Sequence, residues 1–140
     1  MNIMWIDFET RSACDLKVHG VYNYAMDPTT EVLCICYAFD DDPVETWVAT
    51  HNPSINDLLR NPVPDRVRDF KGQIRAHNAA FERLIFKHVL GLEFDDEQFY
   101  CTATQARANC MPGSLGDVGR FCGVDQKKDY RGTQLIRWLC

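Results

Sequence analysis

The sequence lacks any long apolar run. No stretch of its 140 residues approaches the roughly 20 consecutive apolar residues that a membrane-spanning helix requires. The opening residues, MNIMWIDFETRS, also lack the basic start and the apolar segment of a secretory signal peptide. We therefore expect a soluble, cytoplasmic protein with no membrane partner.

The sequence has seven cysteines but no CxxC pair of the kind found in zinc ribbons and redox sites. Without a secretory signal we expect these cysteines to be reduced. Cys34 and Cys36 lie within the apolar run VLCICYAF, where small thiols pack well. The alternative, a zinc-bound regulatory domain that uses cysteines, stays open, and the zinc content of the purified protein would test it.

A surplus of positive charge is also missing, since the formal net charge is −5. This argues against a broad basic surface that grips duplex DNA, because neutralised phosphates supply most nonspecific affinity. It does not exclude a nucleic-acid enzyme, because a site that holds divalent cations is itself acidic. Internal repeats and linkers are absent, so we expect one domain over residues 1–140.

Short apolar runs predict strands in the first half of the chain. Ile3–Phe8, Val32–Phe39 and Val44–Val48 are separated by turn-forming residues at 26–30 and 40–43. We interpret them as an antiparallel meander of about three strands. Gln73–Ala76 predicts a further strand, and Phe99–Thr102 a brief one.

Helical patterns dominate the second half. The predicted helices are a short one after the capping-box pair Ser54 and Asp57, then Ala79–Leu90, Ala103–Asn109, a helix from the capping residue Ser114 through Phe121 that Gly123 ends, and Thr133–Cys140. Strands that alternate with helices indicate an α/β protein, with a mixed sheet and helices packed against it.

The first candidate site is a pair of acids on the first strand. Asp7 and Glu9 are two residues apart, so their carboxylates project from one face, while Phe8 points the other way. Two such acids repel each other unless a divalent cation lies between them. The pair therefore predicts a metal site, and the alternative is a solvated end of the strand.

The second candidate lies where the chain passes from strand to helix. Asn78 is suited to cap the helix, and Glu82 falls in its first turn, where the helix dipole favours an anion. Four residues apart, the two are expected to share a face. Phe81 could stack on a nucleobase, although an aromatic residue on an amphipathic helix commonly belongs to the core.

These residues carry a resemblance to a known family. Residues 6–10 (IDFET) and 77–82 (HNAAFE) resemble the first two motifs of DEDD-type 3′–5′ exonucleases, which have the ribonuclease H-like fold. Residues 20–25, 31–34, 101–103 and 112–115 look like the exonuclease region of bacteriophage family A DNA polymerases. The resemblance covers nearly the whole chain, and a phage source would place the protein in the host cytoplasm.

The resemblance implies a role for each matching residue. Asp7 would bind two metal ions, Glu9 one of them, and Glu82 would match the acid of the second motif, where the family commonly has Asp. Asn78 and Phe81 would line the path of a single-stranded DNA 3′ end, and Thr10 with its neighbouring backbone would contact the terminal nucleotide. The implied cofactors are Mg²⁺ or Mn²⁺, two ions about 4 Å apart.

The family's third motif, a Tyr or His followed by Asp four or five residues later, is not found. The YxxxD pair Tyr37 and Asp41 precedes the second motif, and we interpret it as a core tyrosine and a turn aspartate. The apolar end of the chain, with Trp138 and Leu139, has no helix-terminating residue. We expect from this a truncated domain or one part of a split polymerase, and self-association or docking through this end.

Two functions remain open at this point. The first is a proofreading-type exonuclease module for single-stranded DNA, alone or completed by the remaining polymerase chain. The second is a catalytically silent ribonuclease H-like domain that binds a polymerase, a nucleic acid or another partner. Metal-dependent nuclease activity separates the two.

Overall fold

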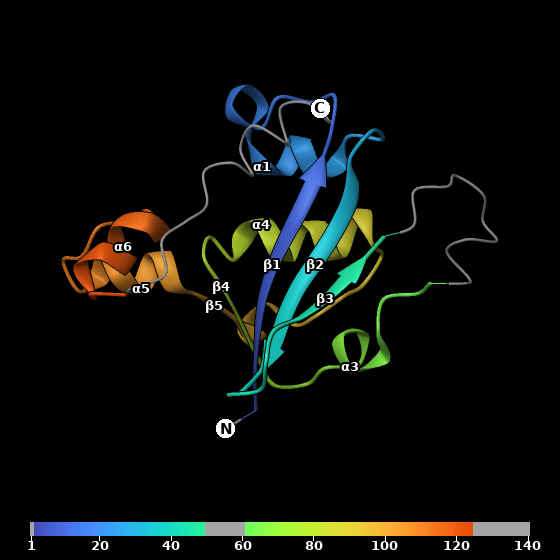
Figure 1. Cartoon of the computed structure of the whole chain (residues 1–140). Coiled ribbons are helices and arrows are strands. Elements are labelled where there is room, and N and C mark those ends of the chain that lie inside the picture. Colours follow the sequence, from blue (N-terminus) through green and yellow to red (C-terminus); the bar gives the residue numbers. More distant parts are fainter. Residues whose placement is uncertain (1, 50–60, 125–140) are drawn as a thin grey trace.

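The computed structural model describes residues 2–49 and 61–124 and contains a five-stranded sheet (Figure 1). The strands are β1 (Ile3–Arg11), β2 (Glu31–Phe39), β3 (Glu45–Val48), β4 (Gln73–Ala76) and β5 (Phe99–Cys101), in the order β3-β2-β1-β4-β5. The pairs β1–β2 and β2–β3 are antiparallel, whereas β1–β4 and β4–β5 are parallel. The predicted α/β class with a mixed sheet is confirmed, and it is consistent with the ribonuclease H-like fold.

Helices follow or connect these strands. They are α1 (Leu16–Met26), α3 (Asp65–Arg68), α4 (Ala80–Leu84), the π-helix η1 (Ile85–Val89), the 3-10 helix η2 (Asp96–Gln98), α5 (Thr102–Ala108) and α6 (Leu115–Phe121). In Figure 1, α4 passes behind β1 and β2, while α5 and α6 lie to one side of the sheet. The predicted helix over residues 79–90 is confirmed as the continuous pair α4 and η1.

The start and end of α6 match the sequence prediction. The Ser114 hydroxyl accepts a hydrogen bond from the Asp117 N–H at 3.2 Å and so caps the helix. Gly123 follows the helix with a φ of 68°, the left-handed conformation that glycine adopts without strain. The helix predicted after Ser54 and the one predicted at Thr133–Cys140 lie outside the described residues.

The predicted meander is correct in its strand pairing but wrong in its connection, because α1 lies between β1 and β2. Asp15 caps α1 by accepting hydrogen bonds from the N–H groups of Lys17 and Val18. Gly20 interrupts the helix with a φ of 76°. Only Tyr24 and Ala25 of α1 are buried, so this helix contributes little to the hydrophobic core.

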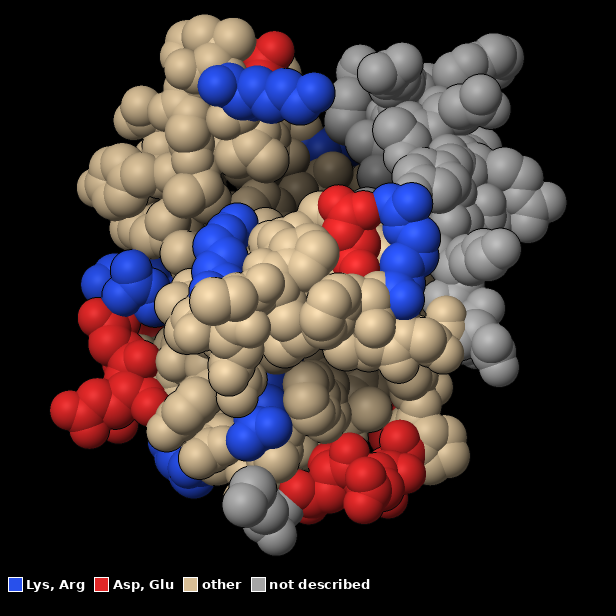
Figure 2. Space-filling view, turned by 90° about the vertical axis from the view of Figure 1, so that its left-hand side faces the viewer, with Lys and Arg blue, Asp and Glu red and all other residues tan. Residues whose placement is uncertain are grey.

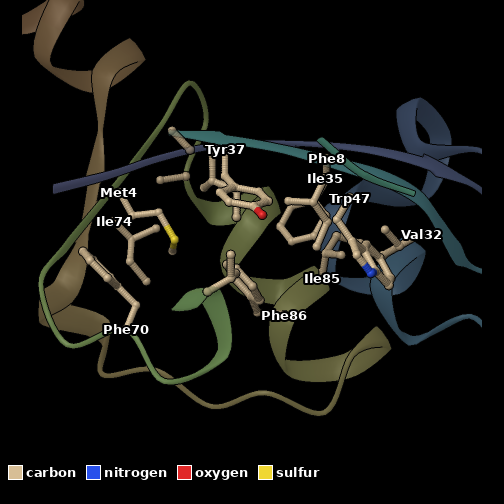
Figure 3. Close-up of a cluster of buried hydrophobic side chains, with 14 of the residues drawn as sticks. Met4, Phe8, Val32, Ile35, Tyr37, Trp47, Phe70, Ile74, Ile85 and Phe86 are labelled. Carbon is tan, nitrogen blue, oxygen red and sulfur yellow. The ribbon is translucent and has the colours of Figure 1, made fainter. Parts of the chain in front are cut away.

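The hydrophobic core lies between the sheet and the pair α4 and η1. The Phe86 side chain is 1% exposed, and its ring centre lies 4.9 Å from that of Phe8 on β1 and 4.7 Å from that of Phe94. Figure 3 shows Phe86 and Ile85 directed toward the sheet residues. Alternate residues of β1 enter this core, which leaves the residues between them on the other face.

Basic side chains are dispersed on the side that carries α5 and α6. Figure 2 shows the lysines and arginines of the described residues as separate groups divided by uncharged surface on this side. It therefore presents no continuous basic surface, in agreement with the negative net charge. In residues 2–49 and 61–124, no helix is long and apolar enough to cross a membrane.

Candidate active site

Strand β1 places Asp7 and Glu9 on one face of the sheet, as predicted. Both residues are exposed, whereas Phe8 between them is buried on the face that packs against η1. Glu9 is the last residue before an irregularity in the pairing with β2. The two carboxylates are therefore presented together at the end of the regular ladder.

Strands β1 and β4 are no longer paired next to these two acids, and this leaves an opening in the sheet. Strand β4 pairs with β1 only from Ile3 to Trp5, so Asp7 lies beyond the last paired residue. The chain turns from β4 into α4 at this level, and Glu82 follows in the first turn of the helix. The predicted position of Glu82 in the first turn is confirmed, and it brings a third carboxyl group to the opening.

Glu82 is buried, with only 2% of its surface exposed. Burial raises the pKa of this carboxyl to about 8, and the negative charge of Asp7 adds to the shift, while the backbone N–H of Glu82 lowers it. Its Oε2 atom has no hydrogen-bond partner in the structure. A buried carboxylate oxygen of this kind is costly unless an ion or a donor reaches it.

Asn78 does not cap α4, so this prediction is wrong. Its φ of 73° lies in the left-handed region, and the helix begins after Ala79 without a side-chain capping bond. The Asn78 carbonyl instead accepts a hydrogen bond from the Phe81 N–H at 2.8 Å. Asn78 is exposed and Glu82 is buried, so the two do not share a helix face as predicted.

Two further predicted site residues face the core. Phe81 is partly buried against the core, and its ring centre lies 6.0 Å from that of Tyr24. Thr10 is buried on the face opposite Glu9, with its hydroxyl 2.8 Å from the Tyr24 hydroxyl. The structure therefore brings Asp7 and Glu82 together, but it does not bring the Thr10 side chain to them.

Sequence reasoning missed Cys101, at the end of β5. Burial raises the pKa of this thiol, but hydrogen bonds from the Thr104 hydroxyl and from the backbone N–H groups of Thr104, Ala79 and Asn78 outweigh this effect and lower the pKa to about 7. The negative charge on Cys101 also contributes to the raised pKa of Glu82. No sequence pattern indicates this neighbourhood, because it depends on the parallel pairing of β4 with β5.

Cys34 and Cys36 are also closer to the site than expected. They pair with Glu9 and Asp7 across β1 and β2 and are partly buried on the acidic face, not in the core. Burial and the neighbouring Cys36 and Glu9 raise the pKa of Cys34. The alternation of residues along Val32–Phe39 is the signal that could have located them.

His77 joins the end of β4 to the elements that follow. Its ring nitrogens lie 3.1 Å from Thr102 Oγ1 and 2.9 Å from the carbonyl oxygen of Gly113. Both nitrogens are therefore engaged in contacts that hold α5 and the segment before α6 beside the β4–α4 turn. This supports a structural role for the histidine of the HNAAFE segment.

The acidic residues fit a divalent cation in their chemistry, because carboxylate oxygens are the ligands that Mg²⁺ and Mn²⁺ prefer. The orphaned Oε2 of Glu82, within electrostatic reach of Asp7, is the structural observation that supports such a group. Within the two described ranges, however, no three His, Cys, Asp or Glu side chains are grouped closely enough to hold an ion.

Comparison with known proteins relates the chain to a phage DNA polymerase. The chain is 36% identical over 139 residues to the DNA polymerase of Bacillus phage SP02. The aligned region covers 99% of the chain and 21% of that polymerase. No family model matches the sequence. The chain is therefore homologous to part of a phage DNA polymerase and spans about a fifth of its length.

Proposed function

We propose that this chain, as a homologue of part of a phage DNA polymerase, forms the catalytic face of a 3′–5′ exonuclease module for single-stranded DNA. The observation that carries the proposal is the buried Glu82 carboxyl, whose Oε2 has no hydrogen-bond partner and which lies within electrostatic reach of Asp7. A buried polar group without a partner costs stability, and a ligand that reaches Oε2 would offset this cost, which supports the proposal.

Asp7, Glu9 and Glu82 are the residues that would hold Mg²⁺ or Mn²⁺. The chemistry supplied by two such ions is activation of a water molecule and stabilisation of charge on the leaving 3′ oxygen. The protein's part is to present carboxylates from a rigid strand and from the first turn of a helix. Since these side chains do not form a ready three-ligand cluster, we expect substrate phosphate to complete the site.

Asn78 and Phe81 flank Glu82 and are the residues we propose for contact with the 3′ end of the DNA. Asn78 is exposed on the turn, and Phe81 is only partly buried. Thr10 would act through its backbone, because its hydroxyl is bonded to Tyr24. The remaining polymerase chain is the proposed source of any group that these residues do not supply.

The alternative is a catalytically silent ribonuclease H-like domain that binds a partner. The observation that favours it is the lack of a ready three-ligand cluster among the described residues. A silent domain would keep the fold and the surface, but its Asp7 carboxylate would have no catalytic role.

The test is degradation of a 5′-labelled single-stranded oligonucleotide with Mg²⁺ or Mn²⁺. We expect a ladder of shortened products from the parent protein and a loss of more than about 100-fold in Asp7→Ala, because a metal ligand is removed. Asp41→Ala is the matched control, since Asp41 is exposed in the turn between β2 and β3. This control should keep the parent rate.

Two results would contradict the proposal. Equal degradation by the parent and by Asp7→Ala would show that the degradation does not use the Asp7 carboxylate. An absence of degradation by the parent, both alone and with the remainder of the related phage polymerase added, would favour the silent domain.

A further inference from the structure

One face of the sheet carries a row of three side chains from three neighbouring strands. Trp5 of β1 pairs with Arg75 of β4, and Arg75 pairs with Tyr100 of β5. The Arg75 Cζ atom lies 5.3 Å from the centre of the Trp5 ring and 5.9 Å from that of Tyr100. The guanidinium group therefore lies between two aromatic rings, and we call these residues the aromatic–arginine row.

The row lies on the face opposite α4 and η1. In Figure 1 this face points toward the viewer, and none of the described helices crosses in front of β1. Trp5 is 39% exposed and Tyr100 48%, whereas Met4 and Ile74, their neighbours on the other face, are fully buried. Parallel sheets are normally covered on both faces, whereas the helices of residues 2–49 and 61–124 leave this face of β1 open.

One hydrogen-bond donor of Arg75 lacks an acceptor in the structure. Its Nη2 donates to Gln73 Oε1 at 3.1 Å, but its Nε is buried and has no partner in the structure. A buried donor without an acceptor is destabilising, and a cation between two rings attracts a carboxylate more than an apolar group. The occupant that fits this face therefore brings an acidic side chain to Arg75 and apolar side chains to the two rings.

A nucleic acid fits the aromatic–arginine row itself less well, whereas the carboxylates of the candidate site, Asp7 and Glu9, lie farther along β1 on the same face. The basic residues of the five strands are Arg11 and Arg75, and Arg11 already pairs with Glu31 at 2.7 Å. Neutralisation of several phosphates needs more cations than this. A helix, by contrast, is the element that covers sheet faces in α/β proteins.

The length of the relative points to a source for this helix. The chain matches 21% of the related phage polymerase, so about four fifths of that polymerase lies outside the matched stretch. We propose that the aromatic–arginine row is a docking surface for an α-helix from that outside part, which places an acidic residue against Arg75. This inference needs the homology but not the proposed nuclease activity.

The experiment replaces the matched stretch of the related polymerase with this chain and compares the chimera with the isolated chain. Hydroxyl-radical footprinting read by mass spectrometry measures the oxidation rate of each aromatic side chain. We expect Trp5 and Tyr100 to be oxidised at least about threefold more slowly in the chimera, because an interface excludes water from its centre. Tyr22 on α1, which is 57% exposed, is the internal control and should keep its rate.

Charge reversal tests the role of the arginine. Arg75→Glu in the chimera should return the oxidation rates of Trp5 and Tyr100 to those of the isolated chain. Arg66→Glu is the matched control, since its side chain is 62% exposed on α3, and it should keep the protection. If circular dichroism shows that Arg75→Glu is unfolded, Arg75→Met is used, which replaces the unbranched aliphatic part of the arginine without its charge, and it should remove part of the protection of Trp5 and Tyr100.

Unchanged oxidation of Trp5 and Tyr100 in a chimera that still synthesises DNA would overturn the proposal. Protection that arises only when single-stranded DNA is added would also overturn it, in favour of a nucleic-acid surface. If the chimera synthesises no DNA, the isolated chain is footprinted with the separately made remainder of the polymerase, and unchanged rates there have the same meaning. None of these outcomes depends on nuclease activity, so the two proposals fail separately.

Discussion

At the scale of single residues, Glu82 has the most unusual environment. Its folded-state pKa of about 8 lies above the ordinary value of 4.5, chiefly because of burial. Below pH 4.5 the carboxyl is protonated in both the folded and the unfolded protein, so it causes no pH dependence. Between pH 4.5 and about 8 only the folded protein keeps the proton, so the free energy of unfolding falls as pH rises.

Glu82→Gln removes this titration, and we predict that it changes the pH dependence of stability. Between pH 4.5 and 8 the variant should gain stability relative to the parent by up to about 1.4 kcal/mol per pH unit, because Gln has no proton to lose. Denaturant unfolding at several pH values measures the difference. Glu93→Gln, at a side chain that is 80% exposed, is the control; the same slope in both variants would contradict the burial of Glu82.

At the scale of elements, the turn between β4 and α4 decides where the site lies. Asn78 adopts a left-handed conformation there, which Asn tolerates better than most residues. The turn lets α4 start beside the part of β1 that β4 does not pair with, and Glu82 in the first turn of α4 is buried. Asn78 therefore has two separate roles. Its backbone adopts the left-handed conformation of the turn, and its side chain is proposed to contact the DNA.

Two substitutions of Asn78 separate these roles. Asn78→Gly should be at least as stable as the parent, whereas Asn78→Ala should lose about 1 kcal/mol, because its Cβ disfavours a φ of 73°. If the side chain contacts the DNA 3′ end, the glycine variant should fold normally yet degrade the oligonucleotide more slowly. Thermal unfolding and product ladders measure the two effects. Full activity of Asn78→Gly would limit Asn78 to its backbone role.

At the scale of the whole molecule, one aromatic cluster joins the sheet to the helices behind it. Phe86 contacts Phe8 on β1 and Phe94 after η1, and its ring centre lies 6.4 Å from that of Phe99 on β5. These residues come from distant parts of the chain. The cluster therefore holds β1 in place and, with it, the two carboxylates of the candidate site.

We predict that Phe86→Ala destabilises the protein by about 3–5 kcal/mol, because it leaves a cavity in the core. Phe121→Ala is the matched control, because Phe121 on α6 is 68% exposed. It should change the free energy of unfolding by less than about 0.5 kcal/mol. The midpoints of urea unfolding measure both variants. Similar losses in the two would show that Phe86 is not the centre of the core.

The sequence by itself was enough to predict the strands, most of the helices and the local positions of Asp7, Glu9 and Glu82. Alternation along β1 is a local property, so it was enough to predict that Asp7 and Glu9 share a face. The first-turn position of Glu82 and the Ser114 cap of α6 also follow from neighbouring residues. Helix α1 was missed because Gly20 interrupts it in a non-helical conformation and only two of its residues are buried, so its pattern is not that of a regular amphipathic helix.

Only the tertiary structure decided what surrounds those acids. The burial and raised pKa of Glu82, the Cys101 thiol near it, and the uncovered row of Trp5, Arg75 and Tyr100 all depend on contacts between residues far apart in the chain. The left-handed turn at Asn78 belongs to the same group, since Asn is common both in caps and in such turns. Local patterns specify which face a side chain occupies, whereas desolvation and pairing arise when β1, β4, β5 and α4 pack together.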